Sequence, residues 1–511
     1  MKNFKKIITS DWFLAAIIFI CAAILRLIPE LKAGAWPIGY DTSNTYSAEL
    51  ASYSGSLVNW ITTANILYFI FLPFKLLGMS PDLIMKVLGP IIYGFLNVCF
   101  YIFARRFLKF SNIKSFFLGI LVLLQLASLR LSWDLFRNEL SLSFMFLALP
   151  YVEKISKTKN LIIFTILVGL VVLSNQLVTV LLFVILFAFW VWFLAKKEWE
   201  NLVGLSIPIT IMAILFTIVI SSSGQILYNS HVFFTSEKNY FWRYFYRYDE
   251  VMPYWLLKQN ILSLFSLLYL YLVPTAILGL ILLRKNIALW AMTIWLLFGT
   301  FSSLILVGKG LFVWERWLFM LVFPLSIYSV EGLYWLAKLV GSPQKWVKKY
   351  PQLSLVLSVF TCLAILTFFF IRSWPFLTDT YARSKPPLAN DELNSYFPRT
   401  MVHNSIGLEN MATTLDCVNW LNQHAPSGSV VLVDNRYRGL MITHFDIDNR
   451  NIITNAWSET IQSSTLEVAK KTDFRPVYLI WNISKAIDGF DRIYSSGNRG
   501  VYQALPSFYI H

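Results

Sequence analysis

Long apolar runs recur along the whole chain, and they constrain its fold more than any other feature. Residues 13–28, 204–220 and 352–371 each approach the roughly 20 apolar residues that a helix needs to cross the hydrocarbon core of a bilayer. Of the 511 residues, 57% are hydrophobic and 14% are charged, and the mean hydropathy is +0.59, which excludes an ordinary soluble domain. The sequence therefore predicts a polytopic α-helical membrane protein.

Two decisions fix the number of spans. The apolar tract 160–195 would rise about 50 Å as one helix, too long for a core of about 30 Å, so we expect it to fold back near Asn175. Segment 64–78 contains a proline and a lysine, which favours a helix along the surface rather than a span. Eleven spans are then predicted, near 12–28, 87–105, 115–130, 139–152, 160–174, 177–195, 203–221, 261–283, 287–307, 317–338 and 352–372.

Short clusters of Lys and Arg predict the orientation. With 64–78 on the surface, nearly every tight basic cluster falls on one side, which the positive-inside rule assigns to the cytoplasm. The N-terminus is then cytoplasmic and the tail is outside. The net charge of +15 is explained by these clusters, so no nucleic-acid partner is expected.

The predicted topology divides the chain into a membrane domain and a small outer domain. Residues 1–372 form the membrane domain, with outer loops 29–86, 131–138, 222–258 and 308–316, and residues 373–409 form a linker rich in Pro, Asn and Ser. Residues 410–511 are predicted to form an α/β domain, with a helix at 410–424, strands at 430–434 and 477–481, and a hairpin within 490–505. The four cysteines and five histidines show no ligand spacing, so they predict neither a disulfide framework nor a metal site.

Asp41, in the first outer loop, is the strongest candidate for a catalytic residue. It lies in Trp-Pro-Ile-Gly-Tyr-Asp-Thr, residues 36–42. A carboxylate in such a loop can take a proton from a substrate or hold a metal ion that balances phosphate charge. An Asp followed by Thr, Ser and Asn can equally cap the next helix, so the residues alone leave both roles open. Tyr40, beside it, is a candidate substrate contact.

The first 200 residues or so resemble GT-C glycosyltransferases, the superfamily of the oligosaccharyltransferase catalytic subunits and the protein mannosyltransferases. The shared features are a first span ending Leu-Arg-Leu, the sequence Pro-Ile-Gly-Tyr-Asp-Thr, a surface helix ending Leu-Leu-Gly-Met-Ser and a second span ending Ala-Arg-Arg. The resemblance implies that Asp41 is catalytic. It also implies transfer of a sugar from a polyprenyl phosphate or pyrophosphate carrier at the outer membrane face.

The second outer loop carries Asp134, Arg137 and Glu139. Oligosaccharyltransferase subunits have an acidic pair at the equivalent place that helps bind a divalent metal, but the Asp-x-Asp spacing is absent here. Asp134 and Glu139 could reach one Mg²⁺ or Mn²⁺ together with Asp41, since both ions favour oxygen ligands. Alternatively, they form an internal ion pair with Arg137 that orders the loop. Arg137 is also a candidate phosphate contact.

Basic residues in two further outer loops are candidates for binding the lipid phosphate. The resemblance implies a basic residue near Arg316 or Lys309, and a guanidinium grips phosphate oxygens in two-pronged fashion, although Arg316 could simply pair with its neighbour Glu315. Arg243 and Arg247 lie four apart, which predicts one face of a helix in the headgroup layer that guides a phosphate or merely anchors the loop.

The tail loop at 433–439 follows a predicted strand, where ligand loops often lie, but a structural turn is the alternative. The Trp-Trp-Asp signature of oligosaccharyltransferases is missing, so N-glycosylation is in doubt. The leading hypothesis is a membrane glycosyltransferase that uses a lipid-linked sugar. The alternatives are a transporter or flippase of lipid-linked sugar and a non-catalytic membrane subunit, and the absence of an internal repeat weighs against transport.

The orientation can be tested with cysteines placed at Lys109 and Lys197, with the four native cysteines replaced by alanine. Both positions belong to clusters predicted to be cytoplasmic, so a membrane-impermeant maleimide added outside should leave them unlabelled until the cells are permeabilised. A cysteine placed in 410–511 should label at once. Immediate labelling at 109 or 197 would reverse the orientation.

Overall fold

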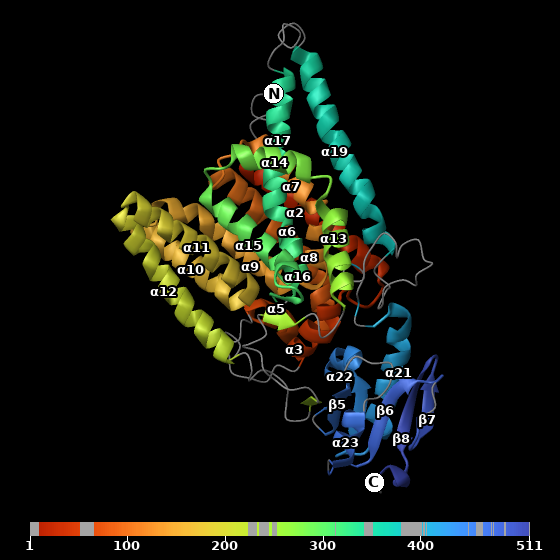
Figure 1. Ribbon diagram of the computed structural model, residues 1–511. Coiled ribbons are helices and arrows are strands. Elements are labelled where there is room, and N and C mark those ends of the chain that lie inside the picture. The colour runs from red at the N-terminus through yellow and green to blue at the C-terminus, as the bar shows by residue number, and fades with distance from the viewer. Residues whose placement is uncertain are drawn as a thin grey trace.

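A helical body and a small sheet-containing tail domain make up the computed structural model (Figure 1). The structure describes residues 10–51, 66–222, 232–234, 245–247, 253–311, 313–341, 351–379, 401, 404, 406–447, 449–455, 463–471, 473, 475–484 and 487–509. The tail domain lies at the end of the helical body where α3 and α5 are found, and the long helices α17 and α19 extend from the opposite end.

The helical body confirms a polytopic membrane protein, but not the predicted number of spans. Seven segments of the described chain are long and apolar enough to cross a bilayer, or up to nine if each of two bent helix pairs is one span. The seven lie in α2 (Asp11–Lys32), α6 (Pro81–Arg106), α11 (Gln176–Lys196), α12 (Trp199–Ser222), α15 (Ile287–Ile305), α16 and α17 (Trp314–Met320 and Val322–Gly341), and α19 (Pro351–Asp379).

Two of the predicted spans are shorter helices. The expected span at 139–152 is α9 (Phe136–Ala148), followed by a 3₁₀ turn, and the expected span at 160–174 is α10 (Thr158–Ser174). At 1.5 Å per residue they rise about 20 and 26 Å, less than the roughly 30 Å of a hydrocarbon core. They pack against each other and against longer helices of the body.

The predicted break in the apolar tract is present, and the segment predicted to lie on the surface contains a short helix. The tract 160–195 breaks at Asn175, whose Oδ1 accepts from the backbone N–H groups of Leu177 and Val178 at 2.9 and 3.1 Å and so caps α11. The predicted surface segment contains α5 (Ile66–Leu76), which rises only about 16 Å and is too short to cross a bilayer.

The two bent pairs are α7 (Asn112–Leu123) with α8 (Leu126–Asp134), at 63°, and α13 (Tyr254–Tyr269) with α14 (Val273–Leu282), at 76°. One helix, α19, contacts both breaks. The Ser373 hydroxyl donates to the carbonyl of Leu124, and the Arg372 guanidinium donates to the carbonyl of Leu267. Because free backbone groups are costly in apolar surroundings, these bonds help to explain how both helix pairs can bend inside the body.

The tail domain contains the helix, strands and hairpin predicted for it. Its elements are α21 (Leu408–His424), β4 (Val430–Asp434), α22 (Arg438–His444), β5 (Asn451–Asn455), α23 (Ser463–Lys471), β6 (Val477–Asn482), β7 (Phe490–Ser496) and β8 (Arg499–Ala504). Strand β4 pairs in parallel with β5 and β6, and β8 pairs antiparallel with β6 and β7. Helix α19 continues to Asp379, so the predicted linker begins with helical residues.

The fourth outer loop corrects the sequence prediction most clearly. Strand β1 (Val232–Phe234) pairs in parallel with β5 and forms the edge of the tail sheet, so this loop joins the tail domain. Arg247 belongs to strand β2 (Phe245–Arg247), which pairs antiparallel with β3 (Lys309–Leu311), and not to a helix. Aromatic residues favour such pairing. Arg243 lies outside the described residues.

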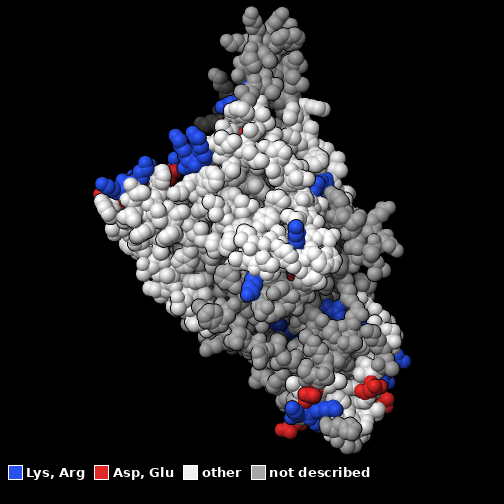
Figure 2. All heavy atoms as spheres, viewed as in Figure 1, with Lys and Arg blue, Asp and Glu red and all other residues white. Residues whose placement is uncertain are grey.

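The described surface separates charged and uncharged regions (Figure 2). Lys and Arg gather at the end of the helical body that points away from the tail, over α10 to α12, whereas the tail carries residues of both signs. The described surface between them shows few charges in this view. This pattern agrees with a body that crosses a membrane, and the orientation of its ends stays a prediction.

Candidate functional site

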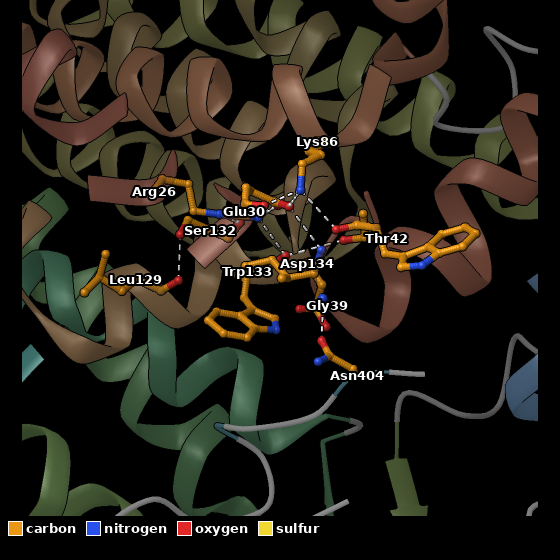
Figure 3. Close-up of polar contacts among 12 residues, drawn as sticks. Arg26, Glu30, Gly39, Thr42, Lys86, Leu129, Ser132, Trp133, Asp134 and Asn404 are labelled. Carbon is orange, nitrogen blue, oxygen red and sulfur yellow. Dashed lines mark hydrogen bonds and ion pairs between the residues drawn. The ribbon is translucent and has the colours of Figure 1, made fainter. Parts of the chain in front are cut away.

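A buried ion pair at the end of α2 anchors the site. Arg26 and Glu30 lie one turn apart, their Nη2 and Oε1 atoms are 2.8 Å apart, and their side chains are 1% and 0% exposed. Arg26 also donates from Nε to the carbonyl of Ser132 at 2.7 Å and from Nη2 to that of Trp133 at 3.2 Å (Figure 3). The first helix thereby fixes the end of α8, which carries Asp134.

The same pair fixes the start of the first outer loop. The backbone N–H of Ile38 donates to Glu30 Oε2 at 3.2 Å. Lys86, from α6, donates to the carbonyls of Glu30 and Trp36, the latter at 3.2 Å. The loop is therefore held by charged groups of two helices directly before Asp41.

Gly39 lets this loop pass over α8. Its φ is +98°, a conformation that other residues adopt only with strain. A Cβ at this position would lie 2.5 Å from the Trp133 carbonyl oxygen and 2.6 Å from the Asp134 Cβ. Both observations require glycine here, and the close approach places Tyr40 and Asp41 next to Asp134.

Asp41 pairs with Arg316, a residue 275 positions away in the sequence. The distance from Arg316 Nη2 to Asp41 Oδ2 is 2.9 Å, and the side chains are 31% and 20% exposed. The suggested pairing of Arg316 with Glu315 is thus replaced by one with Asp41. Asp41 precedes the π-helix Thr42–Tyr46, yet within the described residues its side chain makes no capping hydrogen bond, which counts against the purely structural role.

Burial raises the pKa of Asp41 to about 6, and the nearby Asp134 carboxylate raises it as well, while the Arg316 guanidinium opposes the increase. A general base works best when its pKa lies near the operating pH, because it is then both deprotonated and able to hold a proton. Perturbed carboxyl groups of this kind cluster at functional sites, although ion-pair networks also produce them.

Asp134 and Arg137 do not form the internal pair that was one alternative. Asp134 pairs with Arg130, four residues earlier on α8, and its Oδ2 accepts from the backbone N–H of Tyr40 at 3.1 Å. Arg137 instead donates to Glu49 and to the Tyr68 hydroxyl, the latter at 2.8 Å. The reason is geometric, since Asp134 ends one helix and Arg137 belongs to the next, so the two side chains diverge.

Glu139 is fully buried on α9, and neither of its carboxylate oxygens has a hydrogen-bond partner among the described residues. No three His, Cys, Asp or Glu side chains in the described part of the chain lie close enough to hold a metal ion together. Asp41 and Asp134 are also each paired with a guanidinium. We therefore derive no step through a metal, and metal dependence stays a prediction.

The remaining candidates from the sequence are Tyr40, Lys309 and the tail loop at 433–439. The Tyr40 hydroxyl accepts from Asn44 Nδ2 at 2.9 Å, and burial raises the pKa of Tyr40. Lys309 is exposed at the start of β3, and no hydrogen bond or ion pair joins it to Asp41 or Arg316 in the part of the chain that the structure describes. In the tail loop, Asp434 accepts from the backbone and side chain of Arg436, as the structural-turn alternative predicts.

The sequence analysis missed several residues of this network: Arg26, Glu30, Glu49, Lys86 and Arg130. One signal for them was present. Arg26 and Glu30, and Arg130 and Asp134, are opposite charges four residues apart within or beside apolar segments, where ionisable residues are costly and usually functional or paired.

No protein-family model matches the chain, and no curated protein matches it.

The anchoring pair can be tested by Arg26→Met. Removing Arg26 takes the nearer cation from the buried Glu30 and leaves Lys86 Nζ 3.7 Å from Glu30 Oε2, so we expect a loss of about 3–5 kcal/mol in the free energy of unfolding. The matched control is Arg105→Met, which breaks a pair with Asp11 that is 24% and 54% exposed and should cost about 0–1 kcal/mol. Thermal unfolding in detergent compares the two, and equal losses would contradict the anchoring role.

Proposed function

We propose that the chain is a membrane glycosyltransferase of the GT-C type that moves a sugar from a polyprenyl phosphate or pyrophosphate carrier to an acceptor at the outer membrane face. The proposal rests on the ion pair between Asp41 and Arg316, which come from distant parts of the chain. Arg316 Nη2 lies 2.9 Å from Asp41 Oδ2, and both side chains are partly exposed. Support also comes from the resemblance of the first 200 residues to that superfamily, which implies that Asp41 is catalytic and that a basic residue near Arg316 or Lys309 binds the lipid phosphate.

The pair supplies the two groups that such a transfer requires. The acceptor's nucleophilic atom forms a bond to the anomeric carbon while the bond between that carbon and the phosphate oxygen breaks. Asp41, with a pKa near 6, takes the proton that the acceptor loses. The leaving phosphate departs with the bonding electron pair, and Arg316 stabilises its negative charge through charge-assisted hydrogen bonds.

The pairing in the free protein is compatible with this division of roles. While no substrate is bound, Arg316 and Asp41 neutralise each other at a partly exposed site. A phosphate that binds Arg316 competes for the guanidinium and leaves the Asp41 carboxylate available to the acceptor. The arginine is better suited to this than a lysine, because its planar fork can hold two phosphate oxygens at once.

Transport of lipid-linked sugar is the second candidate, and one observation favours it. The two helix pairs bent at 63° and 76° resemble the discontinuous helices with which many transporters build binding sites. Helix α19, however, donates hydrogen bonds to Leu124 in the first break and to Leu267 in the last turn of α13, just before the second break. The Asp41 group lies where the first outer loop meets the far end of α8. A non-catalytic subunit remains the third alternative.

Asp41→Asn should abolish transfer and leave the protein folded. Asn retains the size of Asp but cannot accept a proton, and loss of a general base costs about 10²–10⁴-fold in rate. Turnover is measured in liposomes with a panel of sugars linked to polyprenyl phosphate and pyrophosphate. Asp11→Asn is the matched control, since Asp11 also pairs with an arginine at 2.9 Å but at the opposite end of α2. Wild-type turnover in Asp41→Asn would refute the catalytic role.

The rate should depend on pH through Asp41. Because the base must be deprotonated, turnover should rise with pH through about 6 and level off above it. Arg316→Gln removes a charge that lowers the pKa of Asp41, so the rising limb should move to higher pH and the affinity for the lipid carrier should fall. Lys309→Gln is the control, and it should change the pH dependence of turnover and the affinity for the lipid carrier less than Arg316→Gln does. If turnover of Arg316→Gln rose over the same pH range as turnover of the wild type, the result would contradict the pairing of Arg316 with Asp41.

A further inference from the structure

The tail domain, together with Asn404 of the linker that leads into it, contacts the first outer loop on both sides of Asp41. Asn404, which precedes α21, accepts from the backbone N–H of Gly39 through its Oδ1 at 2.8 Å. Gly439, in α22, donates its backbone N–H to the Oδ1 of Asn44 at 3.0 Å. Both bonds are buried, and they hold the residue two positions before Asp41 and the residue three positions after it.

The contact at Gly439 is close enough to require glycine. A Cβ at this position would lie 2.2 Å from the Ser43 carbonyl oxygen and 2.4 Å from the Asn44 Cα, both rigid backbone atoms. Helix α22 therefore rests directly on the backbone of the π-helix Thr42–Tyr46. Any larger side chain at 439 would force the two domains apart.

Asn44 continues the contact toward the site. Its Oδ1 accepts from Gly439, and its Nδ2 donates to the Tyr40 hydroxyl at 2.9 Å. A continuous chain of hydrogen bonds thus runs from the tail domain through Asn44 to the neighbour of Asp41. Since π-helical turns have unfavourable geometry on their own, an outside contact of this kind helps to explain why the segment after Asp41 adopts one.

A third contact anchors the other end of α22. His444 Nε2 lies 3.1 Å from Asp82 Oδ2, at the start of α6, and its ring meets the ring of Trp36 edge to face at 6.1 Å between centroids. Trp36 belongs to the same outer loop as Asp41. The tail domain and Asn404 therefore contact the first outer loop at residues 36, 39 and 44. The tail domain also contacts the start of α6 at Asp82.

We propose that docking of the tail domain positions Asp41 for catalysis, with Asn404 and Gly439 as positioning residues. The proposal rests on the proposed glycosyltransferase function and adds that the site is complete only while the tail is docked. Rates fall steeply when a reacting group is displaced, about 10²-fold for roughly 1 Å, so release of the loop lowers turnover even though neither residue touches the reacting atoms.

The test uses the full-length protein and two readouts. Hydrogen exchange followed by mass spectrometry reports the mobility of residues 36–47, and turnover with the panel of polyprenyl-linked sugars reports the chemistry. Gly439→Ala should accelerate exchange in 36–47 and lower kcat at least 10-fold, with less than a twofold change in KM for the donor. Gly169→Ala is the matched control, because a Cβ there has its nearest contact at 3.8 Å, and it should change neither readout.

Asn404 provides a test that does not depend on packing. Asn404→Leu removes the acceptor for Gly39 and should act like Gly439→Ala, whereas Asn404→Asp keeps an acceptor and should restore both slow exchange and turnover. Unchanged exchange in Gly439→Ala and Asn404→Leu would overturn the docking, and rapid exchange with wild-type kcat would overturn the positioning role. A wild-type protein with no turnover on any donor would refute the proposed function instead, while the exchange data would still decide whether the tail holds the loop.

Discussion

The buried ion pair between Arg26 and Glu30 is the contact on which the geometry of the site depends. Two charges removed from water are tolerated when they are paired and hydrogen-bonded, and this pair adds bonds to the backbone through Arg26 Nε and Nη2 and through Glu30 Oε2. Arg26 holds the end of α8, and Glu30 holds the outer loop at Ile38. The two segments that carry Asp41 and Asp134 are thus fixed relative to each other by one helix.

The site above this pair combines residues from every part of the chain. Arg316 comes from α16, Asp41 from the first outer loop, Asp134 from α8, and Gly439 from the tail domain. Each of the two carboxylates is paired with a guanidinium, which offsets part of the cost of taking charges out of water. Burial raises the pKa of Asp41 to about 6, so the same arrangement provides a group able to accept a proton.

Local patterns in the sequence predicted much of the fold. The fold-back at Asn175 follows from the limit that bilayer thickness sets on helix length, and the strands and hairpin of the tail follow from short apolar runs and a glycine-containing turn. Asp41 was a candidate because it is a carboxylate in the first outer loop, and the resemblance to GT-C glycosyltransferases favoured its catalytic role. Two expected spans proved to be shorter helices, because apolar composition alone does not show where a helix ends or bends inside a packed bundle.

The sequence by itself determined the class of protein, the approximate helices and strands, and the candidate carboxylate, since each depends on residues close together in the chain. The tertiary structure decided the partners: Arg316 for Asp41, Arg130 for Asp134, Glu49 for Arg137, and β5 for the strand at 232–234. Long guanidinium side chains can reach several carboxylates, and an edge strand can join any free edge. Which of these contacts forms is settled only when packing brings distant segments together.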